Sequence, residues 1–137
     1  MENYTLDHDM SIMYVTATSF PAGIIDAFDR LRKQVEVKDA RDFFGISHMS
    51  PEGIIYKAWV EQKEEWEAEK YGCELYTMKA GEYYVEKIGD WKKVMPQIGI
   101  AFQSLIKQPD IDLQGACIEW YDEHGGVMCM VKKNAVA

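Results

Sequence analysis

The carboxylate of Glu119 stands at a position where carboxylates are uncommon. It lies within residues 115–122, Gly-Ala-Cys-Ile-Glu-Trp-Tyr-Asp, whose central residues suit a pleated, half-buried β-strand. Because side chains alternate across a strand, Cys117, Glu119 and Tyr121 share one face and the residues between them share the other. If that face points inward, the carboxylate loses its water at a cost of several kcal/mol unless a partner compensates it.

A desolvated carboxylate can serve two kinds of chemistry. It attracts cations in a low effective dielectric, and neighbouring aromatic faces add cation–π attraction of roughly 0.5–2 kcal/mol each. Its pKa is also raised, which suits it to general acid or base catalysis near neutral pH. The competing interpretation is that Ile118 and Trp120 face the core while Glu119 faces solvent, as charged residues on half-exposed strands usually do.

Length and composition narrow the class of protein. The 137 residues predict one domain, 1–137, with a substantial core, and the net charge of -8 disfavours direct binding to a phosphate backbone. No stretch approaches the roughly 20 apolar residues of a membrane span, and no signal peptide is recognisable, so a cytoplasmic location is expected. Cys73, Cys117 and Cys129 fit neither a disulfide framework nor a zinc site. No metal ion or other cofactor is expected.

Two stretches repeat apolar residues at helical spacing, which predicts two amphipathic helices. The first follows Phe20-Pro21, and the second begins at Pro96, because proline suits the first helical turn. Runs of β-branched and aromatic residues between glycines and prolines predict strands. The predicted apolar stripes are Ile24, Ile25, Phe28, Leu31 and Val35 in the first helix and Ile98, Ala101, Phe102, Leu105 and Ile106 in the second.

The chain also repeats itself. Ala27-Phe28-Asp29-Arg30-Leu31 matches Ala101-Phe102-Gln103-Ser104-Leu105, 74 positions later, within the same order of predicted elements. This predicts an α+β fold of two βαββ repeats related by a pseudo-twofold axis, with an antiparallel sheet, two long helices packed on it and a ligand cleft between the halves. The expected limits are a frayed lead-in at 1–10, repeat one at about 11–62, a charged linker at about 63–72, whose acids and lysines are read as a solvated face, and repeat two at about 73–133.

Three short motifs carry a resemblance to a known family. They are Lys79-Ala80-Gly81-Glu82-Tyr83-Tyr84, Ile88-Gly89-Asp90-Trp91 and Ile118-Glu119-Trp120-Tyr121. With the order of elements, they resemble the GyrI-like family, the effector-binding domain of bacterial multidrug-responsive transcription activators and of stand-alone gyrase-inhibitor-like proteins. The resemblance implies that Glu119 lies in the ligand cleft and that Tyr83 is a cleft aromatic. It carries over no promoter activity, because this chain shows no DNA-binding domain.

The first functional hypothesis is a binding protein for an amphipathic, cationic or aromatic small molecule, acting in transcription regulation or drug and toxin sensing. A separate DNA-binding or target protein could be its partner; membranes and nucleic acid are not expected partners. Flexible methionines, eight in all, suit a pocket that accepts many shapes. For each aromatic residue the alternative is a plain core position. The candidate ligand-binding residues are Glu119, Tyr121, Cys117, Tyr83, Tyr56 and Trp91.

Two further hypotheses belong to other classes. Some GyrI-like proteins hydrolyse electrophilic small molecules, and in that case Glu119 would be the general acid or base with Tyr83 or Tyr121 as its proton-donating partner. No arrangement of nucleophile, base and orienting group is recognisable, so an enzyme is the less favoured expectation. A protein-binding inhibitor with an acidic surface ranks last, because the acids are spread along the chain among lysines.

Overall fold

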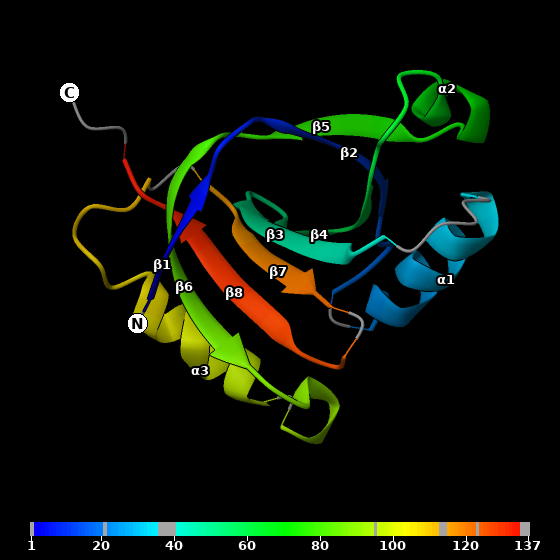
Figure 1. The fold of residues 1–137 in the computed structure, drawn as a ribbon. Coiled ribbons are helices and arrows are strands. Elements are labelled where there is room, and N and C mark those ends of the chain that lie inside the picture. The colour runs from blue at the N-terminus through cyan, green and yellow to red at the C-terminus, as the bar shows by residue number, and fades with distance from the viewer. Residues whose placement is uncertain are drawn as a thin grey trace.

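One curled antiparallel sheet of eight strands organises the molecule (Figure 1). The computed structural model describes residues 2–20, 22–35, 41–94, 96–112, 115–122 and 124–134. The strands lie in the order β1-β6-β8-β7-β3-β4-β2-β5, and each pairs antiparallel with its neighbours. They are β1 (Glu2–Leu6), β2 (Met10–Thr16), β3 (Phe43–Ser50), β4 (Gly53–Glu61), β5 (Glu74–Met78), β6 (Gly81–Ile88), β7 (Cys117–Tyr121) and β8 (Val127–Lys132); the helices are α1 (Ile24–Gln34), α2 (Glu67–Tyr71), the short 3₁₀ helix η1 (Trp91–Lys93) and α3 (Pro96–Leu105).

The strand order is symmetric about the β3–β7 pair. Exchanging β1, β2, β3 and β4 for β5, β6, β7 and β8 reverses the order of strands and leaves the sheet unchanged. The two predicted repeats are therefore present, and the pseudo-twofold axis passes between β3 and β7. In each repeat a further strand precedes the βαββ unit, and that strand pairs with the other repeat: β1 with β6, and β5 with β2.

The expected frayed lead-in at residues 1–10 is wrong. Residues Glu2 to Leu6 form β1, which pairs with Val85 to Gly81 of β6, and Leu6 is buried. Ladder hydrogen bonds along an available sheet edge order a segment whose polar composition predicts no structure.

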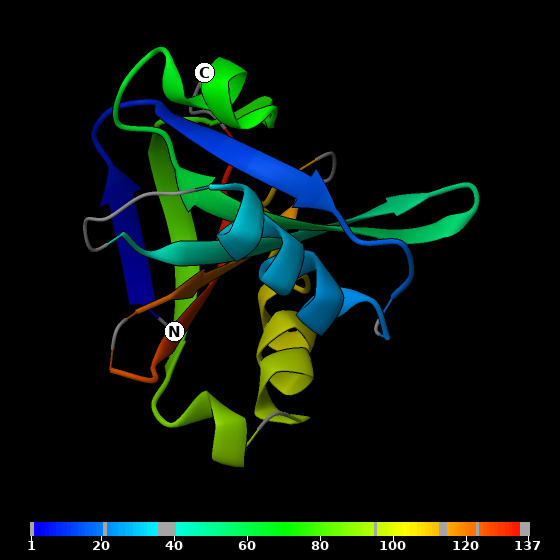
Figure 2. The same cartoon turned by 90° about the vertical axis from the view of Figure 1, so that its right-hand side faces the viewer.

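Both long helices cover the same face of the sheet (Figures 1 and 2). α1 packs on β2 and β4, where Ala27 and Leu31 are fully buried, and α3 packs on β6 and β8 through the fully buried Leu105. The predicted apolar stripes hold at Leu31 and Leu105 but not at their margins, since Ile25 is 76% exposed and Ile106 is 52% exposed. Ala27, which is fully buried, lies outside the predicted stripe. Because α1 and α3 lie over different strand pairs, the central strands β7 and β3 run between them.

The opposite face is buried by the curl of the sheet itself. All eight strands contribute side chains to one core cluster there. Its residues are Leu6, Ile12, Phe44, Ile46, Trp59, Met78, Tyr83, Val85, Ile118 and Met130. Among the described residues, no helix has the length and apolar character needed to cross a bilayer.

The charged linker departs from prediction at one residue. Glu67 opens α2, and its side chain is 3% exposed rather than solvated. Its carboxylate accepts two hydrogen bonds from the Arg41 guanidinium, at 2.9 and 2.7 Å, and two more from the backbone N–H groups of Lys63 and Glu64. This ion pair joins the linker to the chain just before β3.

Candidate functional site

Glu119 lies next to the pseudo-twofold axis. In the β3–β7 ladder it pairs directly with Gly45, which occupies the same position 74 residues earlier in repeat one. Paired residues of an antiparallel ladder share a face, so Gly45 and Glu119 both lie on the face that carries α1 and α3. The alternation predicted for residues 117 to 121 holds: Cys117 and Tyr121 share this face, while Ile118 and Trp120 join the opposite core.

Two tyrosines hold the Glu119 carboxylate. The Tyr56 hydroxyl, from β4, and the Tyr121 hydroxyl, from β7, both donate to Oε1 of Glu119, at 2.8 and 2.7 Å. In the described part of the chain every hydrogen bond to this carboxylate goes to Oε1, and no lysine, arginine or histidine forms an ion pair with it. Glu119 is thus a partly buried acid whose charge has no counterion among those residues.

Gly45 makes room for this arrangement. A Cβ at position 45 would collide with the Tyr56 hydroxyl and lie 2.6 Å from Oε1 of Glu119. Any larger residue would therefore displace either the phenol or the carboxylate. A glycine at this point of the ladder lets a tyrosine from β4 reach across β3 to an acid on β7.

Aromatic rings surround the carboxylate and its two donors. The Phe28 ring, on α1, lies edge-on to the Tyr121 and Tyr56 rings, with centroids 6.0 and 6.3 Å away. Trp91 of η1 approaches Tyr121 at 5.0 Å, and Phe20, which precedes α1, approaches Tyr56 at 5.9 Å. Phe20 is 41% exposed, so this side of the ring cluster reaches the surface.

The electrostatics follow from desolvation. Burial raises the pKa of Glu119, although the hydrogen bonds from Tyr121 and Tyr56 oppose the shift. Burial and the nearby Glu119 charge raise the pKa values of both tyrosines, so the phenols stay protonated as donors. The same two causes raise the pKa of Cys129 to about 12 and that of Cys117 above its ordinary value, which disfavours the thiolate form of both residues.

Five of the six sequence-predicted site residues come together here. Glu119, Tyr121 and Tyr56 are hydrogen-bonded, Trp91 contacts Tyr121, and Cys117 shares their face. Tyr83 does not join them: it belongs to the opposite core, where its hydroxyl donates to the Lys79 carbonyl at 2.6 Å.

The sequence analysis missed three residues of this site: Gly45, Phe28 and Phe20. Phe28 follows the apolar spacing of α1, so nothing separates it from an ordinary core residue. The signal for Gly45 was available in the repeat, because the offset of 74 places it opposite Glu119. Among the described residues, no cluster of three or more histidines, cysteines or acids could hold a metal ion.

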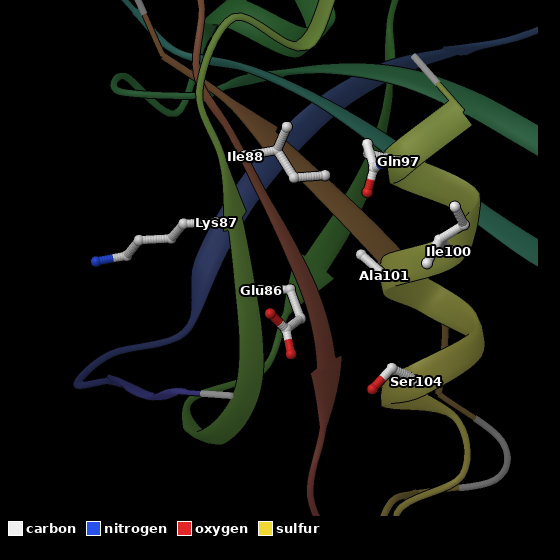
Figure 3. A pocket seen from close by; sticks show the side chains of 7 residues that line it. All are labelled: Glu86, Lys87, Ile88, Gln97, Ile100, Ala101 and Ser104. Atoms are coloured by element: carbon white, nitrogen blue, oxygen red, sulfur yellow. The ribbon is translucent and has the colours of Figure 1, made fainter. Parts of the chain in front are cut away.

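A pocket formed by described residues lies elsewhere, between β6 and α3 (Figure 3). Its volume is about 270 Å³, and it belongs to repeat two rather than to the boundary between the repeats. It is lined by Glu86, Lys87, Ile88, Gln97, Ile100, Ala101 and Ser104.

The fold is a known one. An integron cassette protein from Vibrio cholerae superposes with a TM-score of 0.70 and 10% identity over 97% of this chain and 95% of that one. A hydrolase from Listeria innocua superposes with a TM-score of 0.63 and 12% identity over 97% of this chain and 90% of that one. The protein SAV2435, bound to tetraphenylphosphonium, superposes with a TM-score of 0.64 and 13% identity over 96% of this chain and 93% of that one. No protein-family model and no curated protein matches the chain. At these identities the likeness establishes a shared fold.

Proposed function

We propose that this protein binds an organic cation with aromatic or other apolar substituents at Glu119. The observation that carries the proposal is the carboxylate itself, which is partly buried, held at Oε1 by two phenols, and without a counterion among the described residues. A cation at this place would compensate the desolvated charge, and the faces of Tyr56, Tyr121 and Phe28 would add cation–π attraction.

The neighbouring structures support this ligand class. SAV2435 has the same fold and is bound to tetraphenylphosphonium, a lipophilic cation with four aromatic arms. The GyrI-like resemblance points the same way and suggests a role in effector sensing, with a separate regulator or target protein as the partner.

The test is calorimetric titration with tetraphenylphosphonium. Tetraphenylborate is a matched probe, because it has nearly the same shape and the opposite charge. We expect tetraphenylphosphonium to bind and tetraphenylborate not to bind. Glu119→Gln should lower the affinity for tetraphenylphosphonium by about tenfold or more. Glu52→Gln, which removes an equal charge at the exposed β3–β4 turn, should leave the affinity unchanged. Equal affinity in wild type and Glu119→Gln would refute the proposal.

Hydrolysis is the second candidate function, favoured by the raised pKa of Glu119 and by the hydrolase of the same fold. In this mechanism Glu119 takes a proton from water as the water oxygen bonds to an electrophilic carbon, and the leaving group departs with the bonding electron pair. Tyr121 is the proton donor nearest the carboxylate, whereas Tyr83 lies on the other face of the sheet. Turnover of p-nitrophenyl acetate that persists in Glu119→Gln would exclude this role.

A further inference from the structure

The pocket between β6 and α3 occupies the place where repeat one holds the side chain of Arg30. We propose that this pocket is a second binding site, for a small alkylguanidinium compound that takes the place of that side chain. The site is separate from Glu119 and does not depend on the function proposed there.

The repeat fixes the equivalence of the two helices. Buried Leu31 of α1 corresponds to buried Leu105 of α3, so Arg30 corresponds to Ser104. In the same register Asp26 corresponds to Ile100. The long charged side chain of repeat one is therefore a short hydroxyl in repeat two, and its acidic neighbour is apolar.

The strands give the same correspondence. Gly45 pairs with Ala58 and Ala58 with Val15, while Glu119 pairs with Cys129 and Cys129 with Glu86. Val15 therefore corresponds to Glu86, and Thr16 to Lys87. The strands that pair with the other repeat, β5 and β1, also end their pairing at equivalent positions. β5 pairs with β2 as far as Tyr14, and β1 pairs with β6 as far as Val85. Thr16 and Lys87 both lie just beyond those pairings.

In repeat one the guanidinium closes the gap between helix and strand. Nη2 of Arg30 donates to the Thr16 carbonyl at 2.9 Å, and Nε donates to Asp26 at 2.9 Å. The Arg30 side chain thus crosses from α1 to the edge of β2 that β5 leaves uncovered.

In repeat two the gap remains open as a pocket of about 270 Å³. Figure 3 shows Glu86 on β6 and Ser104 on α3 directed into the space between the two elements, while the Lys87 side chain points away. Lys87 instead pairs with Glu2, at 3.2 Å. Repeat two therefore has a pocket where repeat one has the Arg30 side chain. It also has the Glu86 carboxylate where repeat one has Val15.

These groups match an alkylguanidinium in shape and charge. The Glu86 carboxylate can accept a charge-assisted hydrogen bond from a guanidinium, which is stronger than a bond between neutral groups. The Lys87 carbonyl, at the position of the Thr16 carbonyl, and the Ser104 hydroxyl offer further acceptors. Ile88, Ile100 and Ala101 supply an apolar wall for a short alkyl chain.

The experiment is an NMR titration of the full chain with n-butylguanidinium, with n-butylurea as the neutral analogue of similar shape. We expect n-butylguanidinium to shift the backbone amide signals of residues 86–88 and 100–104 and n-butylurea to bind about tenfold more weakly or not at all. Ser104→Arg should abolish binding, because the new side chain fills the pocket as Arg30 does in repeat one. Ser104→Ala, which keeps the pocket open and removes only the hydroxyl acceptor, should weaken binding far less than Ser104→Arg.

Three results would overturn the proposal: shifts that do not cluster at this pocket, equal binding of the urea, or unchanged binding in Ser104→Arg. Glu86→Gln is the second variant if Ser104→Arg does not fold, and it should weaken binding by about tenfold. Tetraphenylphosphonium titration of Ser104→Arg separates the two sites, since its affinity at Glu119 should equal that of the wild type.

Discussion

At the scale of single residues, the site depends on one acid, two phenols and one glycine. Oε1 of Glu119 accepts from Tyr56 and Tyr121, and only a residue without a Cβ at position 45 leaves space for them. The sequence identified the acid because an ionisable residue in an apolar strand is conspicuous. It could not distinguish Phe28 from core, and it misplaced Tyr83 because the face of a strand depends on a register that a short motif does not encode.

Gly45→Ala tests the space around the carboxylate. The added methyl would collide with the Tyr56 hydroxyl, and overpacking of this kind costs about 1–3 kcal/mol. Denaturant unfolding should show that loss for Gly45→Ala and a much smaller change for Gly89→Ala, where no atom lies within 4 Å of the new Cβ. Equal stability of the two variants would mean that the position 45 contact relaxes without cost.

The raised pKa of Glu119 predicts two pH dependences. The folded protein holds the Glu119 proton more tightly than the unfolded chain does, so ionisation of Glu119 destabilises the fold. This destabilisation is complete above the pKa of Glu119 in the folded protein, and it vanishes as the pH falls below the ordinary pKa of glutamate. Glu119→Gln should therefore be more stable than wild type at high pH, with the difference shrinking in acid. Affinity for tetraphenylphosphonium should fall as the carboxyl protonates, at a higher pH than an exposed glutamate would give. A flat pH profile in both measurements would contradict the desolvation of Glu119.

At the scale of elements, the helices and the linker set where the site can form. α1 and α3 stand over different strand pairs, so the carboxylate lies between them rather than under either. Helical periodicity predicted both helices and the start of α3, because an apolar stripe and an N-terminal proline are local signals. The burial of Glu67 could not be predicted, since its partner Arg41 is distant in sequence and only the fold brings them together.

Glu67→Gln tests this ion pair. Its carboxylate is held by Arg41 and two backbone N–H groups, and removing one member of a buried pair costs about 3–5 kcal/mol. The Arg41 hydrogen bonds lower the pKa of Glu67 to about 2, so the wild type has this stability above the ordinary glutamate pKa and loses it as the pH falls toward 2. Urea unfolding at several pH values should show a difference in the free energy of unfolding between wild type and variant, and this difference should disappear in acid. The exposed Glu65→Gln is the control and should show no comparable gap.

At the scale of the whole molecule, the two repeats are joined by exchanged strands. β1 of repeat one completes the sheet beside β6, and β5 of repeat two completes it beside β2. The internal repeat predicted two related halves. It did not predict the exchange. β1 (Glu-Asn-Tyr-Thr-Leu) and β5 (Glu-Leu-Tyr-Thr-Met) are similar in sequence, but they pair with residues about 80 and 65 positions away from their own, and that similarity does not encode which strand each of them joins.

Fragment complementation tests the exchange. Residues 1–72 alone would leave β1 without β6, and residues 73–137 alone would leave β5 without β2, so each should remain largely unfolded. Mixed together, the two fragments should regain the native circular dichroism spectrum and a cooperative thermal transition. Independent folding of either fragment would show that the exchanged strands are dispensable.

The pairing of Gly45 with Glu119 across the axis has one more consequence. A symmetric dimer of two identical half-length chains could not build this site, because an axial residue would meet its own copy. Two glutamates there would repel each other and crowd out both phenols, and two glycines would offer no charge. Covalent fusion of the halves removes that constraint, because the two equivalent positions can then hold different residues. Repeat two supplies the acid, Glu119, and repeat one has Gly45, which leaves space for it.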